Sequence, residues 1–178
     1  MAPVRSVRCG FALVKLSLGG TECLLMRRDP QWGDLTFIGG HENPGDRANL
    51  QTTARRECLE EVPALRGARV FDLSPLGEEA RYGPTRSRSS PGLVEYTVRF
   101  FALRFRRLPE AIAAGFGPRS LNVWVPQDEV LAARPRKISA FAQVLETAAP
   151  GGVRSIPLSW SADLPGAPRL PDGPRETA

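Results

Sequence analysis

Apolar and polar residues alternate along several short stretches of the chain, which is the period-two pattern of β-strands with one buried face. The alternation is clearest over residues 93–105, where Val94, Tyr96 and Val98 share one face. A glycine pair after residue 18 marks a turn between two such stretches and predicts a hairpin-like pair. Less regular patterns predict further strands over residues 6–18, 22–28, 35–38, 68–73 and 121–125.

Two other stretches have the spacing of an amphipathic helix. Residues 47–62 contain neither Gly nor Pro, and Pro63 ends the helix because the residue before a proline disfavours the helical conformation. A last helix is expected over residues 136–148. The first helix has a buried stripe of Leu50, Ala54 and Cys58. Strands and helices in this order predict an α/β fold in which helices cover a mixed sheet.

Two segments lack any apolar period. Residues 77–92 are rich in Arg, Ser, Gly and Pro and are expected to form a polar loop. Ten of the 29 residues from Pro150 to Ala178 are Pro or Gly, which favours a flexible segment, although Trp160 offers an anchor that could dock on the domain. We therefore expect one domain over residues 1–148 and a Pro/Gly-rich tail over residues 149–178.

Composition adds little to this picture. The net charge is +5, and arginine makes up 22 of the 24 basic residues, since only Lys15 and Lys137 are lysines. Guanidinium groups suit phosphate recognition, but a compositional bias toward arginine on a solvated surface explains the excess equally simply. Three scattered cysteines are too few for a disulfide framework or a zinc module, so we expect free thiols in a reducing compartment.

The lengths of the apolar segments bear on the cellular location of the protein. No segment approaches the roughly 18–20 uninterrupted apolar residues of a membrane helix. Lys15 interrupts the first apolar run, and no cleavage pattern of small residues follows it, so this run favours a strand over an export signal. We expect a cytoplasmic protein with no membrane partner.

The chemistry is concentrated in one predicted helix. Glu57, Glu60 and Glu61 stand at positions i, i+3 and i+4, so their side chains share one face and repel one another. A divalent cation turns such crowding into an advantage, and oxygen-only ligands suit Mg²⁺ or Mn²⁺. A solvated acidic face paired with neighbouring arginines is the simpler alternative. The pair Gly39-Gly40 favours the cation, because glycine lets the backbone approach closely and offers a carbonyl ligand.

Taken together, residues 39–64 resemble the signature of the Nudix hydrolase family: Gly, five residues, Glu, seven residues, then Arg-Glu-aliphatic-x-Glu-Glu-x-Gly. Gly40 matches the first glycine, Asp46 stands at the glutamate position, and Arg56 and Glu57 match the Arg-Glu pair. The paired glutamates of the signature are matched by Glu60 and Glu61. The resemblance extends over residues 5–148 and implies a Nudix-type α/β/α sandwich with a mixed sheet.

The sequence departs from this signature at several positions, and Asp46 in place of the glutamate is one of them. Nine residues instead of seven separate Asp46 from Arg56, and Pro63 stands where the closing glycine is expected. Two extra residues inside a helix would rotate everything beyond them by about 200°. We therefore place the insertion in the loop before the helix, which keeps the glutamate face intact and leaves the role of Asp46 open.

The resemblance implies a Mg²⁺-dependent enzyme, with Mn²⁺ as a substitute, that cuts a pyrophosphate bond in a nucleoside diphosphate linked to another moiety. Glu57, Glu60 and Glu61 with the Gly40 carbonyl would hold the metal, and Arg56 would position a glutamate. Glu57 would also orient the attacking water, so the catalytic set is Glu57, Glu60 and Arg56. The substrate would be a nucleotide-derived small molecule; only the arginine excess favours an RNA end or cap.

Residues outside the glutamate face offer weaker candidates for substrate binding. Arg28 at a strand end and His41 after the glycine pair could meet a phosphate, and Glu95 lies on the polar face of the long strand. Each is as simply explained by solvent exposure. The alternative to an enzyme is a Nudix-fold sensor that binds a nucleotide without cutting it, which the insertion and Pro63 favour. The sequence leaves open whether the protein forms a homodimer.

Overall fold

The computed structural model describes residues 3–66, 70–86, 91–132 and 138–160. Its centre is a mixed seven-stranded sheet with the order β2-β3-β4-β1-β6-β5, to which β7 adds by pairing with β3. β1 and β6 run parallel, whereas every other pair is antiparallel. The strands are β1 (Val4–Leu13), β2 (Lys15–Leu18), β3 (Thr21–Arg28), β4 (Leu35–His41), β5 (Phe71–Arg86), β6 (Leu93–Phe105) and β7 (Asn122–Pro126).

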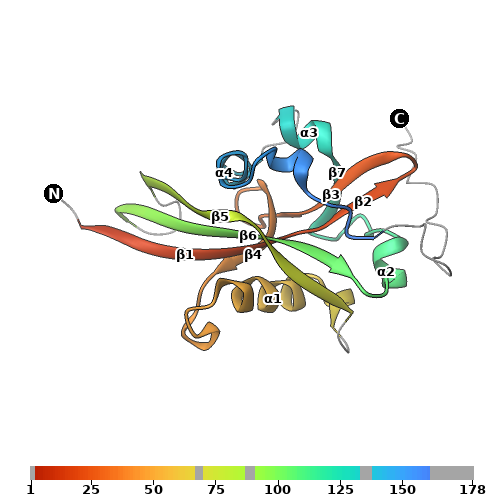
Figure 1. Ribbon diagram of the computed structural model, residues 1–178, viewed down its shortest axis with the longest axis horizontal. Helices are drawn as coiled ribbons and strands as arrows, with labels where there is room; N and C mark the ends of the chain where they lie inside the picture. Colours follow the sequence, from red (N-terminus) through yellow and green to blue (C-terminus); the bar gives the residue numbers. More distant parts are fainter. Residues whose placement is uncertain (1–2, 67–69, 87–90, 133–137, 161–178) are drawn as a thin grey trace.

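Helices cover both faces of this sheet, as Figure 1 shows. α1 (Leu50–Glu61) packs on β1 and β4, and α4 (Phe141–Ala148) covers the opposite face together with α3 (Gln127–Ala132). A short α2 (Glu110–Ala113) and the 3-10 turns η1 (Pro44–Asp46), η2 (Pro63–Leu65) and η3 (Gly152–Ser155) complete the elements. The expected α/β/α sandwich with a mixed sheet is thus confirmed.

Each face of the sheet carries its own apolar core. On the α1 side, Leu50, Ala54 and Cys58 are buried against Ala12 and Phe101. The stripe expected from the sequence is therefore the packing stripe, and Cys58 is a buried packing residue. On the other side, Phe37 and Phe100 pack under α3 and α4. All three thiols are free and buried.

The first helix is shorter than expected, and the reason is local. It begins at Leu50, because the side chain of Asn49 caps it by accepting hydrogen bonds from the backbone N–H groups of Gln51 (2.9 Å) and Thr52 (3.3 Å). Arg47 and Ala48 precede the cap in the left-handed region, with φ of 54° and 55°. The extra residues thus lie before the helix, as expected from the sequence.

The expected polar loop over residues 77–92 is wrong for residues 77–86. These residues belong to β5, a 16-residue strand at the edge of the sheet. Its pairing with β6 is irregular between Leu76 and Ala80 and again between Tyr82 and Thr85. An edge strand with such bulges tolerates the Pro and Gly residues that indicated a loop. Residues 87–90 lie outside the described residues.

The chain continues as packed structure beyond Ala148, where the sequence favoured a flexible segment. Val153 and Ile156 are buried, and Ser159 is fully enclosed. The backbone of Ser159 bonds to Lys15 and Phe105, its N–H donating to the Lys15 carbonyl and its carbonyl accepting from the Phe105 N–H (2.8 Å each). Trp160 packs on the α1-side core. These few apolar residues follow no regular period, yet residues 153–160 pack on the sheet and form hydrogen bonds with it.

The other expected elements agree more closely with the structure. The second helix begins at Phe141, and residues 136–137 of the expected range lie outside the described residues. The first expected strand is divided at Val14 into β1 and β2. Within the described part of the chain, no helix is long and apolar enough to cross a membrane.

Candidate active site

The glycine pair of β4 lies directly under the glutamates of α1. Gly40 pairs with Gly10 of β1, and a Cβ atom at Gly40 would lie 2.6 Å from the Glu57 Oε1 atom. The neighbouring Gly39 N–H donates to Glu61 Oε2 (3.0 Å). The strand backbone thus forms a cradle for two carboxylates, and any side chain at Gly40 would displace the first of them.

Arg56 holds the other side of this cluster. Its Nη1 atom donates to Glu57 Oε1 (2.8 Å) and to Glu60 Oε2 (3.1 Å). Its Nη2 atom also donates to the His41 carbonyl (2.9 Å), which fixes the guanidinium against the end of β4. Arg56 therefore joins Glu57, Glu60 and the end of β4 through one guanidinium group.

Asp46, whose role the sequence left open, is the anchor of Arg56. Its two oxygens accept from Nε and Nη2 of Arg56, each at 3.1 Å. The carboxylate is 2% exposed and also accepts from Thr53 Oγ1 and the Asn43 N–H, both at 3.0 Å. Hydrogen bonds from Arg56 lower the pKa of Asp46 to about 2. Asp46 therefore fixes the guanidinium of Arg56, which in turn contacts Glu57 and Glu60.

Glu61 is held from the opposite side by a second arginine. Arg27 of β3 forms an ion pair with Glu61, its Nε atom lying 3.0 Å from Glu61 Oε1, and it donates through Nη1 to the Glu61 main-chain carbonyl (3.4 Å). Asn122 of β7 donates to the same carbonyl (2.8 Å), so two strands fix the C-terminal end of α1.

The electrostatics of the cluster favour a cation. Burial raises the pKa of Glu57, and burial raises the pKa of Glu61 to about 7 although the Gly39 N–H and Arg27 oppose the shift. Three crowded carboxylates beside a glycine backbone form an oxygen-only donor set, which is what Mg²⁺ prefers. The residues fit such an ion. Over the described residues, however, no three Asp, Glu, His or Cys side chains converge as a ready-made metal site, and guanidinium groups lie among the carboxylates.

The other sequence candidates are not brought into this cluster. Arg28 is exposed and donates to the Gly33 carbonyl (3.2 Å). His41 is an exposed residue whose ring lies beside Tyr96, with centroids 6.2 Å apart, and partial burial of the ring lowers its pKa. On β6 it is Arg99 that pairs with Gly10, the residue beside Gly40. Glu95 lies four residues before Arg99, so it is displaced by roughly 13 Å along the strand from this position.

Sequence reasoning missed Arg27 and Asn122. It named Arg28, but strand side chains alternate, so only one of the two adjacent arginines can face α1. Leu25, two residues before Arg27, lies in the α1-side core, and this period would have selected Arg27 once the face of α1 was known. No signal could have found Asn122, which is 61 residues from Glu61 in the chain.

Comparison with known proteins agrees with this geometry. The family model of the NUDIX domain matches residues 8–146, most of the chain. Among solved structures, the C. elegans Ap4A hydrolase matches with a TM-score of 0.50 and 16% identity, over 79% of this chain and 94% of that one. The E. coli ORF135 protein matches with a TM-score of 0.50 and 17% identity, over 82% and 90%.

A third solved structure, Shewanella oneidensis NrtR, matches with a TM-score of 0.54 and 16% identity over 80% of this chain, which spans only 61% of that protein. At such identities these structures show a shared fold alone. No curated protein sequence matches the chain significantly. Because the domain model covers most of the chain and the glutamates lie on the glycine pair, the chain belongs to the Nudix family.

Proposed function

We propose that this protein hydrolyses a pyrophosphate bond in a nucleoside diphosphate linked to another moiety, with the help of Mg²⁺ or Mn²⁺. The observation that carries the proposal is the cradle formed by Gly39 and Gly40 under the carboxylates of Glu57 and Glu61. Such close contact between carboxylates and strand backbone has no packing purpose, but it brings oxygen ligands to one place.

The cation would be held by Glu57, Glu60 and Glu61 with the Gly40 carbonyl. When bound, it supplies positive charge that activates a water molecule and offsets the charge of the leaving phosphate. Glu57 orients that water, because its carboxylate lies directly on Gly40 and its raised pKa suits a group that accepts a proton. Arg56 keeps Glu57 and Glu60 in place.

The substrate contacts stay proposals of unequal support. His41 has the best support, because it is exposed and follows Gly40 directly. Arg28 and Glu95 have no contact with the carboxylates that would favour them. A cytoplasmic location, a homodimer and an RNA end or cap as substrate stay predictions from the sequence.

A nucleotide sensor is the second candidate function, and two observations favour it. Guanidinium groups occupy the carboxylates in the described arrangement. NrtR, which shares the fold, has also been solved with a 27-mer DNA, at a TM-score of 0.50 to this chain. On this alternative the protein binds a nucleotide derivative tightly and releases it uncut.

A substrate panel separates the two. Purified protein is incubated with nucleoside triphosphates, dinucleotides, nucleotide sugars and capped RNA, with Mg²⁺ or Mn²⁺, and phosphate or pyrophosphate release is measured. We expect turnover of at least one compound, lost in Glu60→Gln and Glu61→Gln. Tight binding without release from any compound would overturn the enzyme in favour of the sensor.

Gly40→Ala tests the cradle itself. Its methyl group meets the mobile end of Glu57 and not the backbone, so the protein should fold normally and lose at least about tenfold in kcat. Gly20→Ala is the control for adding a methyl to a glycine, since nothing lies within 4 Å of that position. It costs some stability because Gly20 has a φ of 82°, but it should leave kcat unchanged.

A further inference from the structure

The two arginines that neutralise the glutamates are held in different ways. Arg56 is tied to Asp46, a buried carboxylate outside the glutamate face, by two hydrogen bonds of 3.1 Å. For Arg27, the only carboxylate in reach among the described residues is that of Glu61. Arg56 can therefore keep its place when the glutamates change partners. The position of Arg27, in contrast, depends on Glu61, which is itself a proposed metal ligand.

Both oxygens of Glu61 are already engaged. Oε2 accepts the Gly39 N–H (3.0 Å), and Oε1 forms an ion pair with Arg27, whose Nε atom lies 3.0 Å away. A divalent cation on Oε1 would meet the guanidinium at a few ångströms, where like charges repel strongly in a partly buried site. Glu61 is 17% exposed and Arg27 25%, so water screens this repulsion only in part. The two cations exclude each other.

From this geometry we propose that Arg27 is a built-in competitor of the divalent cation: it neutralises Glu61 in the metal-free protein and leaves the carboxylate when the cation binds. The proposal rests on the proposed function, which supplies the cation.

The surroundings allow the exchange without unfolding. The Asn122 amide holds the Glu61 main-chain carbonyl at 2.8 Å and keeps the end of α1 in place when Arg27 moves. The guanidinium of Arg27 is partly exposed, so it can turn into solvent while its stem stays on β3. The affinity for the cation is then set by a competition, and metal binding and release of Arg27 are one event.

The test is the affinity for Mn²⁺ measured by isothermal titration calorimetry. Arg27→Met removes the competitor, and we expect it to bind Mn²⁺ about tenfold more tightly than the wild type. Arg27→Lys keeps the charge without the planar fork and should fall between them. Arg55→Met is the matched control: it also removes one positive charge from this region, but Arg55 lies over the Phe71 ring and touches no carboxylate among the described residues. It should change the affinity less than twofold.

A second measurement follows the two guanidinium groups directly. In an NMR titration with Mg²⁺, the Nε–H signal of Arg27 should shift as its ion pair with Glu61 breaks. The Nε–H signal of Arg56, which is bound to Asp46, should shift much less. This readout uses the wild-type protein and does not depend on how the variants fold.

The outcomes are distinct. Unchanged or weaker Mn²⁺ binding by a folded Arg27→Met variant, or an unaffected Arg27 signal in saturated wild type, overturns the competition while the proposed function stands. If neither wild type nor Arg27→Met binds Mn²⁺ or Mg²⁺, the metal-dependent function and this inference fail together. Binding by Arg27→Met alone supports the competition in its strongest form.

Discussion

The two faces of the sheet are built by opposite means. On the α1 face the helix backbone comes so close that a Cβ atom at Gly10 would overlap the Leu50 carbonyl oxygen. On the other face aromatic rings fill the space, with the rings of Phe11 and Phe100 stacked at 5.9 Å and those of Phe37 and Phe100 edge to face at 6.1 Å. The α1 face is tight where the helix backbone passes over Gly10, whereas the centre of the other face is filled by stacked aromatic rings.

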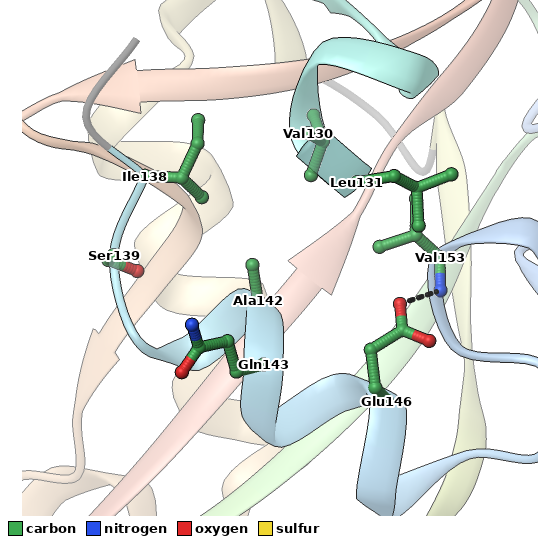
Figure 2. Close-up of a pocket in the computed structure, with 8 residues that line it drawn as sticks. All are labelled: Val130, Leu131, Ile138, Ser139, Ala142, Gln143, Glu146 and Val153. Atoms are coloured by element: carbon green, nitrogen blue, oxygen red, sulfur yellow. Dashed lines mark hydrogen bonds between the residues drawn. The ribbon is translucent and has the colours of Figure 1, made fainter. Parts of the chain in front are cut away.

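The second face also leaves space unfilled. A hollow of about 320 Å³ lies between α3, α4 and η3. Ile138, Ala142 and Val153 are among the apolar residues that line it (Figure 2). At its rim the Glu146 carboxylate accepts the Val153 N–H (3.0 Å). The glutamates lie on the face where the α1 backbone comes close to the sheet. Only this close approach lets the carboxylates of Glu57 and Glu61 reach the backbone of β4.

The largest effect should come from one methyl group on the tight face. Gly10→Ala forces the Cβ atom against the backbone of Leu50, which cannot turn aside, so α1 has to move. We expect a loss of about 3 kcal/mol in the free energy of unfolding and a drop in Tm of roughly 6–12 °C for a chain of this size. Thermal unfolding followed by circular dichroism measures it. A Tm within 2 °C of the wild type would show that α1 does not lie this close.

Asp46→Asn breaks the anchor on the same face. The substitution removes the charge that holds Arg56, and we expect about 2 kcal/mol of lost stability at neutral pH. The pKa of Asp46 is lower in the folded chain, about 2 against a usual 3.8. The stabilisation is therefore fully present above pH 3.8, and it is lost as the pH falls toward 2.

Chemical denaturation between pH 2 and pH 7 follows this difference. The gap between Asp46→Asn and the wild type should be constant above about pH 4 and close below it. Asp72→Asn is the control, because Asp72 forms an equally direct pair with Arg106 (2.6 Å) that is half exposed on both sides. Exposed pairs contribute little. A constant gap down to pH 2, or an equal loss in the control, would contradict the role of Asp46.

The sequence was sufficient for the tight face where the requirement is local. Glutamates three and four apart share one helix face, and the resemblance to the Nudix signature placed Gly40 with them. The close approach of Glu57 to Gly40 itself was not predicted. The wrong loop over residues 77–86 shows the limit: the Pro and Gly residues of β5 are tolerated because the strand lies at the sheet edge, which is a property of the topology.

The missed residues are those set by long-range contacts. Asp46 was recognised as an acid but not as the partner of Arg56, because that role depends on how the inserted Arg47 and Ala48 turn the chain back. Arg27 and Asn122 reach the helix end from two other strands, and their register with one another is a product of the folded sheet. Neither composition nor periodicity shows that Asp46 lies beside Arg56, or that Arg27 and Asn122 lie beside the end of α1.

A smaller effect separates Glu61 from Asp46 by pH. Burial raises the pKa of Glu61 to about 7, so the folded state holds this proton more tightly than the unfolded chain, whose value is near 4.5. The contribution of Glu61 to the stability of the metal-free protein should therefore be greatest below pH 4.5. It should fall as the pH rises toward 7. Glu61→Gln mimics the protonated form and should remove most of this pH dependence.

Denaturation of both proteins in EDTA at pH 4.5, 6 and 8 measures the slope. The Gln variant should match the wild type at pH 4.5 and exceed it at pH 8. Saturating Mg²⁺ should raise the Tm of the wild type alone at pH 8, because only the wild type keeps the ligand. Parallel curves for the two proteins would show that Arg27 fully offsets the burial of Glu61.

The smallest effect tests the loose face. Ala142→Leu adds three carbons to a residue that lines the hollow, against the single carbon of Gly10→Ala. Leucine suits a helix nearly as well as alanine, and apolar atoms that enter unfilled space gain contacts without displacing others. We expect a gain of about 0.5 kcal/mol and a Tm one or two degrees higher. Ala54→Leu on the fully buried α1 stripe is the matched variant and should be destabilising. A similar loss in both would mean that the two faces are packed equally tightly, and the close approach of α1 would then be no special property of the face that carries the glutamates.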